Sequence, residues 1–110
     1  MLSLKSIRNI LKVLAEDSRL RIVYLLNIRK LNVAELCRIT GSKQSIISKH
    51  LTRLRYSGLV ADRRDGQFIY YSLKPFPDPF LKQLMGCILK EVAKQSRAKN
   101  DLARLKKMKS

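Results

Sequence analysis

Apolar residues recur every three or four positions along most of the chain, which is the spacing of one buried helix face. Over residues 2–14 this pattern predicts a first amphipathic helix. A second helix begins near Asp17-Ser18, both residues that favour an N-cap, and its dense apolar content predicts a helix at the centre of the core. Asn32 can cap a short third helix over Val33 to Ile39, which ends at Thr40-Gly41.

The pattern changes character between residues 41 and 73. A helix opens at Gly41-Ser42 and stops at Ser57-Gly58. Two alternating stretches, Val60 to Arg64 and Phe68 to Leu73, follow as strands, with Asp65-Gly66 as the hairpin turn between them. Helix, tight glycine turn, helix and hairpin together predict a mostly α winged helix-turn-helix fold with about five helices and a two-stranded wing.

The chain after the wing is predicted to be one more helix with a basic tail. Pro75, Pro77 and Pro79 cannot continue a strand or a helix, so they form a connection. The next helix carries a long apolar stripe, and residues 97–110 are expected to be its frayed, basic extension. We therefore divide the chain into a winged-helix and dimerisation domain, residues 1–96, and a C-terminal extension, residues 97–110.

The stripe on the last helix has two interpretations. It could pack on the core of its own chain, or it could pair with the first helix and a second copy of the protein. The second interpretation predicts a homodimer, because the other helices and the wing already supply partners for one another. The predicted dimer interface consists of Ile7, Ile10, Leu11, Leu81, Leu84, Met85, Ile88, Leu89 and Val92.

Charge identifies the class of partner. The 110 residues include 24 Lys and Arg but 8 Asp and Glu, giving a net charge of +16, which is typical of a polyanion binder. On the fourth helix Ile47, Leu51 and Leu54 form the buried face, so polar and basic residues face outward beside the basic wing. The predicted contacts to double-stranded DNA are Lys43, Gln44, Ser45, Ser48, Lys49, His50, Arg53, Arg63, Arg64 and Gln67.

Other function classes fit the sequence less well. A small basic protein could instead bind RNA or act as a nucleoid protein, but sequence-specific RNA modules usually expose aromatic residues on a sheet, and Tyr70 and Tyr71 alternate on a two-stranded wing. The chain has no Ser/His/acid set and no glycine-rich phosphate loop, so we expect neither an enzyme nor a cofactor. It also lacks a long uncharged apolar run, and two cysteines suit a reducing cytoplasm, where we expect the protein to reside without membrane contact.

Three runs in this order resemble the ArsR/SmtB family of bacterial winged-helix repressors: residues 14–26, 44–51 and 58–73. The resemblance covers residues 11–74 closely and the terminal helices by pattern alone. It implies a homodimer built from the first and last helices, and a repressor that leaves its operator when an effector binds.

The effector site departs from the family pattern. Members that sense arsenite, cadmium or lead carry two ligand cysteines on the third helix, and these positions fall on Asn32 and Ala34 here. Neither residue supplies the thiolate that a soft metal needs, so no metal site is expected. Cys37 and Cys87 could still act as a thiol sensor of oxidants, persulfide or arsenite, or they could be two reduced structural cysteines.

Overall fold

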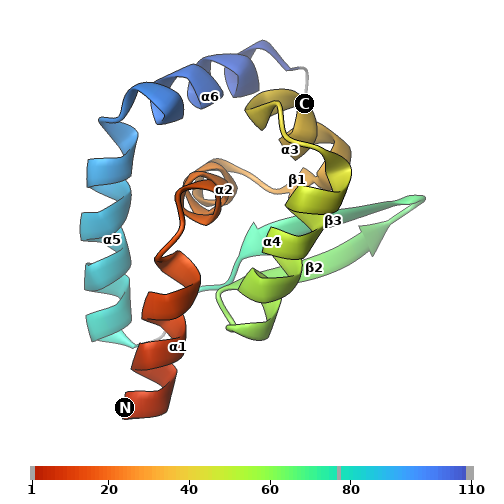
Figure 1. Cartoon of the computed structure of the whole chain (residues 1–110). Helices are drawn as coiled ribbons and strands as arrows, with labels where there is room; N and C mark the ends of the chain where they lie inside the picture. Colours follow the sequence, from red (N-terminus) through yellow and green to blue (C-terminus); the bar gives the residue numbers. More distant parts are fainter. Residues whose placement is uncertain (1, 77, 109–110) are drawn as a thin grey trace.

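The computed structural model describes residues 2–76 and 78–108, and its elements surround one central helix (Figure 1). Pro77 in the predicted connection and residues 109–110 of the predicted extension lie outside the described residues. No helix within the described residues is long and apolar enough to cross a membrane. The elements are α1 Leu4–Leu14, α2 Asp17–Ile28, β1 Leu31–Asn32, α3 Val33–Thr40, α4 Gln44–Tyr56, β2 Val60–Asp65, β3 Phe68–Leu73, α5 Pro79–Ala93 and α6 Ser96–Lys107.

Helix α2 forms the centre of the core, as predicted. Its side chains Ile22, Val23 and Leu25 have no exposed surface. A helix that is apolar on most sides must be surrounded, and α1, α4, α5, α6 and β3 all contact α2. Figure 1 shows α2 end-on with the other helices around it.

Helices α3 and α4 form the predicted helix-turn-helix. The Asn32 side chain accepts a hydrogen bond from the Glu35 N–H at 2.8 Å, and the Glu35 side chain accepts one from the Asn32 N–H at 2.9 Å. This reciprocal capping box fixes where α3 begins. The helix ends at Gly41, whose φ of +76° is favourable for glycine and turns the chain toward α4.

The wing is a three-stranded sheet instead of the predicted two-stranded hairpin. Strands β2 and β3 pair antiparallel, from Val60 opposite Leu73 to Asp65 opposite Phe68, and Gly66 in the turn has a φ of +65°. The additional strand, β1, pairs with β3 on its other edge. β1 has two residues, which is too short to produce a recognisable alternation.

The C-terminal part differs from the expected frayed extension. Asp78 caps α5 by accepting a hydrogen bond from the Phe80 N–H at 2.9 Å, and α5 ends at Ala93. A separate helix, α6, then begins at Ser96 and turns back over the molecule to contact α2 and α3 (Figure 1). Ala98 and Leu105 are buried in these contacts, so α6 is part of the packed fold.

A buried ion pair holds α6 against α2. Asp101 has no exposed surface, and its two carboxylate oxygens accept hydrogen bonds from Nε and Nη2 of Arg21 at 2.7 and 2.8 Å. Arg21 also donates to the Thr40 carbonyl at 3.4 Å, and Arg104 donates to the Ile39 carbonyl at 3.0 Å. The hydrogen bond with Asp101 raises the pKa of Arg21 above its ordinary value, so this side chain stays charged. These bonds connect α2, α6 and the end of α3.

A second polar contact connects α4 to the start of α2. His50 Nε2 lies 3.2 Å from a Glu16 carboxylate oxygen, and Nδ1 lies 3.4 Å from Nη1 of Arg19. Burial lowers the pKa of His50 below its ordinary value of 6.5; Glu16 opposes this shift, and the charges of Arg19 and Arg53 add to it. The neutral form of His50 is therefore favoured more than in an exposed histidine.

Replacing Asp101 should weaken the fold more than replacing an exposed acid. Asp101→Asn leaves Arg21 charged and largely buried without its carboxylate, so the free energy of unfolding should fall by about 3 kcal/mol. Urea unfolding at one fixed protein concentration measures this difference. Glu91→Gln is the matched control, because Glu91 and its partner Lys94 are both about 70% exposed and should contribute less than about 1 kcal/mol. Equal decreases in both variants would contradict the assigned role of the buried pair.

The pKa of His50 should respond to its neighbours with opposite signs. NMR can follow it directly because it is the only histidine in the sequence, and its pKa should lie below 6.5. Glu16→Gln should lower the pKa further, and Arg53→Gln should raise it. Since the pKa of His50 is lower in the folded protein, the unfolded chain binds the imidazole proton at a higher pH than the folded protein does. The stability that neutral His50 contributes above about pH 6.5 is therefore lost as the pH falls. His50→Gln should lack this pH dependence. A pKa that neither substitution moves would remove these groups from the environment of His50.

Candidate nucleic-acid interface

The outward face of α4 is open and polar. Ile47, Leu51 and Leu54 are buried on the opposite face, whereas Gln44 and Lys49 are exposed. This arrangement follows from the 100° rotation per residue of a helix, which places each group on its own side. Both faces match the sequence prediction.

The start of α4 is suited to an anion. Lys43 is the N-cap residue, and its side chain makes no capping hydrogen bond. The first turn of a helix presents backbone N–H groups and the positive end of the helix dipole. Lys43 is exposed and adds a full positive charge at the same place. A phosphate group could therefore bind here without displacing a side chain.

The wing projects beyond α4 (Figure 1). It carries two exposed arginines. Arg63 lies opposite Tyr70 on β3, and Arg64 lies opposite Ile69. Because neighbouring side chains of a strand point to opposite faces, the two arginines cannot both face the same surface. One wing therefore offers cations on both of its faces.

A concave surface lies between α3, the start of α4 and the wing. Its volume is about 540 Å³, and both Gln44 and Gln67 line it. Val33, Ala34 and Cys37 of α3 contribute to the same surface together with residues of β3. Two predicted contact residues from distant parts of the sequence are thus brought to one surface.

Three further predicted residues have different surroundings. Arg53 is exposed and borders a shallow cavity with Lys49 and His50. Ser48 is half-buried, and its carbonyl accepts a hydrogen bond from the Thr52 hydroxyl at 2.9 Å. His50 was predicted to contact DNA; its side chain is 15% exposed and faces Glu16, so its contact with the rest of the chain is the one that the structure shows.

Sequence reasoning missed two residues on this face. Ile46 is 44% exposed on α4, although its neighbour Ile47 is buried. Helical rotation places Ile46 near Arg53 on the polar face, and this signal was available in the sequence. An exposed apolar side chain on such a helix can contact a thymine methyl group. Tyr56 at the end of α4 is 82% exposed, with the Arg55 guanidinium 5.9 Å from its ring centre.

An ion pair orients the wing relative to α4. Arg55 Nη1 lies 3.0 Å from a carboxylate oxygen of Asp62 on β2. Both side chains are partly exposed, so the pair contributes orientation more than stability.

The predicted dimer interface divides into two groups. Ile10, Leu81, Met85 and Leu89 are buried in the core of their own chain, and Met85 has no exposed surface to offer a partner. Their assignment to the interface is therefore wrong, because these side chains pack within the chain itself. Leu11 is 51% exposed. The remaining residues are half-buried: Ile7, Leu84, Ile88 and Val92.

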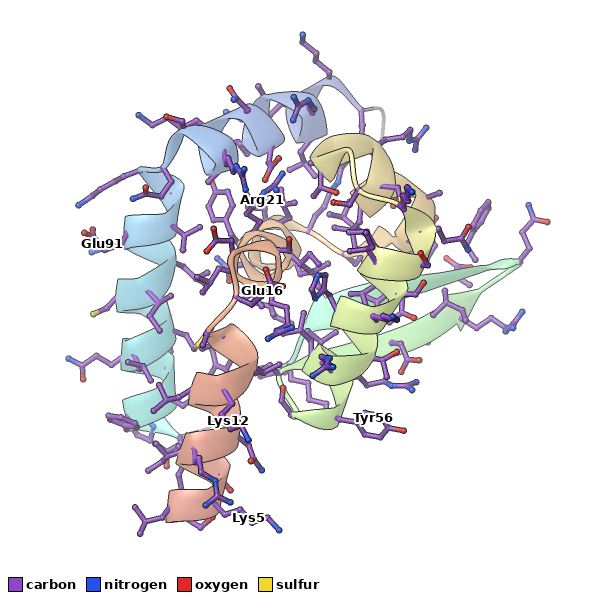
Figure 2. The ribbon with its side chains drawn as sticks, in the orientation of Figure 1. Lys5, Lys12, Glu16, Arg21, Tyr56 and Glu91 are labelled. Atoms are coloured by element: carbon purple, nitrogen blue, oxygen red, sulfur yellow. The ribbon has the colours of Figure 1, made fainter. Side chains whose placement is uncertain are left out.

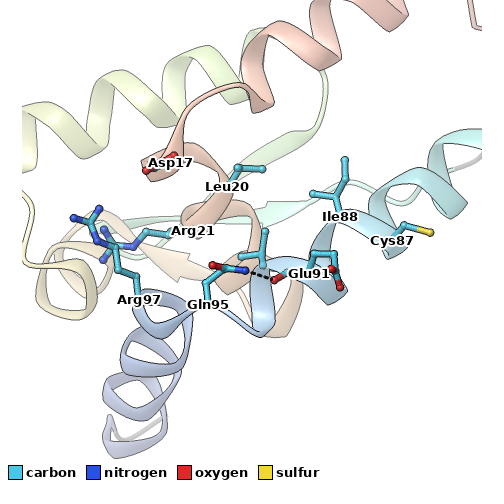
Figure 3. A pocket seen from close by; sticks show the side chains of 9 residues that line it. Asp17, Leu20, Arg21, Cys87, Ile88, Glu91, Gln95 and Arg97 are labelled. Atoms are coloured by element: carbon cyan, nitrogen blue, oxygen red, sulfur yellow. Dashed lines mark hydrogen bonds between the residues drawn. The ribbon is translucent and has the colours of Figure 1, made fainter.

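A groove of about 610 Å³ runs between α2, α5 and the start of α6 (Figure 3). Leu20, Ile88 and Val92 line its apolar part, and Arg97 lies at the α6 end. The Gln95 amide donates a hydrogen bond to the Glu91 carbonyl at 3.2 Å beside it. The groove was not predicted, because α6 was not expected to be a separate helix.

The two cysteines belong to different sites. Cys37 is half-buried and borders the cavity between α3 and the wing, whereas exposed Cys87 borders the groove on α5. Both are free thiols. Among residues 2–76 and 78–108, no group of three His, Cys, Asp or Glu side chains could hold a metal ion.

Known proteins are similar to this chain in both sequence and fold. A family model described as bacterial regulatory protein, arsR family, matches residues 16–62. The arsenical resistance operon repressor of Escherichia coli (strain K12) is 45% identical over 65 residues, covering 58% of this chain and 56% of that protein.

Two solved structures are similar over most of the chain. Reduced HlyU from Vibrio cholerae superposes with a TM-score of 0.69 and 31% identity, covering 83% of this chain and 92% of HlyU. The transcriptional repressor BigR from Xylella fastidiosa gives a TM-score of 0.67 and 31% identity, covering 83% and 90%. The chain spans little more than half the length of the first curated relatives it matches. With its winged helix-turn-helix fold, the chain belongs to the ArsR family of bacterial regulatory proteins.

Proposed function

We propose that this protein is a homodimeric, sequence-specific DNA-binding transcriptional repressor. The observation that carries the proposal is the open polar face of α4 beside a basic wing, in a chain with a net charge of +16. A helix of this size fits the major groove, and a basic wing beside it can follow the phosphate backbone. The repressors among its relatives support the same function.

The residues on this surface have two different roles in the proposal. Gln44 and Lys49 can reach base edges, since an amide can pair with adenine and an ammonium group can donate to guanine. Ser45 is exposed on the same helix and can contact either. Lys43 and the wing arginines contact phosphates, which position the protein without reading the sequence.

The apolar side chains left open on α1 and α5 support a dimer. Leu4 and Leu11 are 86% and 51% exposed, and Leu84 and Ile88 are half-buried. In the view of Figure 1, both helices lie on the side away from the wing tip. A second copy that covers this side would leave both wings and both α4 helices free for DNA.

The proposed effector response does not use thiolates at positions 32 and 34, where metal-sensing members of the family carry ligand cysteines. Asn32, at one of these two positions, is 7% exposed and uses its side chain to cap α3. Cys37 and Cys87 border different cavities, so a thiol-based response would have to use them separately or between copies. The arsenical name of one relative therefore does not transfer to a site on α3 of this chain.

Selection from a random duplex pool, followed by one substitution, tests specific reading. The protein should enrich a two-fold symmetric sequence. Gln44→Ala should weaken the binding free energy by about 1 to 3 kcal/mol on that sequence and little on random DNA. Gln83→Ala, at an exposed position of α5, is the control and should bind as the parent does. Failure to enrich any sequence would contradict specific recognition, and equal effects of Gln44→Ala on both DNAs would make Gln44 a backbone contact.

A charge at Leu11 should separate the dimer. Leu11→Glu places a carboxylate in the proposed interface, where it would be buried without a partner. Because Leu11 is 51% exposed in the single chain, the variant should keep the parent's circular dichroism. Light scattering should show dimers for the parent and monomers for the variant. Ile28→Glu, at a 43% exposed position at the end of α2, should remain dimeric. A dimeric Leu11→Glu protein would exclude this part of α1 from the interface.

A further inference from the structure

Helix α6 presents mostly positive charge to solvent. It contains five basic residues, and its single acid, Asp101, is buried. Asp101 receives two hydrogen bonds from Arg21 and lies 3.6 Å from Arg104 Nη1, so it partly balances Arg104 and leaves the other four basic residues of α6 without an acidic partner on this helix. The exposed basic residues are Arg97, Lys99, Arg104, Lys106 and Lys107.

The basic C-terminal half of α6 lies at the helix-turn-helix. Arg104 donates a hydrogen bond to the Ile39 carbonyl in the last turn of α3, and Arg21 connects Asp101 to the neighbouring Thr40 carbonyl. This last turn directly precedes Gly41, where the chain turns toward α4. Figure 1 shows the C-terminal end of α6 beside α3. The positive charge of α6 is therefore next to the turn that leads into α4.

We propose that α6 is a second DNA-contacting element, in which Lys106 and Lys107 bind phosphates that flank the base pairs read by α4. The inference rests on the proposed function. Both lysines are exposed, and a lysine ammonium on its flexible stem suits a phosphate better than a base edge. Exposed Arg38 on α3 and Lys43 before α4 carry the same charge, so exposed positive charge is present on α6, on α3 and at the start of α4.

The buried ion pair distinguishes α6 from a flexible basic tail. A disordered tail must lose conformational freedom when it binds, which weakens its contribution. Helix α6 is already ordered, because the Asp101 carboxylate receives two hydrogen bonds from Arg21 and because Ala98 and Leu105 pack in the core. The backbone that carries its lysines is thus fixed relative to α3, and their contribution should depend on where the DNA ends.

Binding to duplexes of two lengths tests this proposal. One duplex carries only the selected site, and the other adds flanking base pairs on both sides. The parent should bind the longer duplex more tightly, and Lys106→Gln/Lys107→Gln should remove most of that gain. For this double variant on the longer duplex, the slope of the logarithm of the binding constant against the logarithm of the salt concentration should become less steep than for the parent. The difference should be about 0.9 for each phosphate that the variant no longer neutralises. Lys106→Arg/Lys107→Arg keeps both charges and should keep the gain.

A control with the same change in charge completes the experiment. Lys5→Gln/Arg8→Gln alters two exposed basic residues in the first half of α1, which lies at the other end of the molecule from α6 (Figure 2). This variant should keep the parent's gain from the flanks. The proposal would be overturned if both double variants lost the same part of the affinity gained from the flanks, or if the α6 variant lost none of it. The second result would instead favour an acidic protein as the partner of α6. If the parent itself binds no DNA specifically, the proposed function fails, and this result differs from all the others.

Discussion

The burial of α2 is the constraint on which the rest of the structure depends. Its apolar side chains need cover on most sides, and α1, α4, α5, α6 and β3 supply it. Arg21 is a charged residue that reaches into this packing and requires a buried acid, and α6 provides Asp101. The position of α6 therefore follows from satisfying α2, and so does the division of α5 into a buried face and an open one.

The same packing determines what α4 can do. Ile47, Leu51 and Leu54 attach one face of α4 to the core, while His50 faces Glu16 and Arg55 pairs with Asp62 on the wing. These contacts restrict rotation of α4 about its axis and its angle to the wing. A surface with the proposed DNA-reading function must hold its side chains at fixed positions, and here their orientation comes from residues on the inner side of the helix and at its end.

Local signals made the helix-turn-helix and the wing predictable, whereas contacts between distant residues were not. The Asn32 cap, the glycine at the end of α3 and the Asp65-Gly66 turn all act within a few residues. Strand β1 exists only because β3 lies beside it, and α6 is held by a pair 80 residues apart in sequence. The α5 stripe was predicted at the right positions, but periodicity cannot distinguish a face that packs inward from one that packs on a partner. The contact between His50 and Glu16 was not predicted, because the position of His50 on α4 does not reveal that Glu16 lies opposite.

Most acids of this chain make contacts within the chain. Six of its eight acidic residues make capping bonds or ion pairs within the chain: Glu16, Glu35, Asp62, Asp78, Glu91 and Asp101. Eight acids cannot neutralise 24 basic residues, and the mutual repulsion of the excess positive charge disfavours the compact state. A polyanion relieves that repulsion when it binds, so binding and stability are coupled. Because Asp101 is buried against α2, and Glu16, Glu35 and Asp78 cap helices, these acids stabilise the fold while most of the positive charge stays on the surface, where it is available to the proposed polyanionic partner.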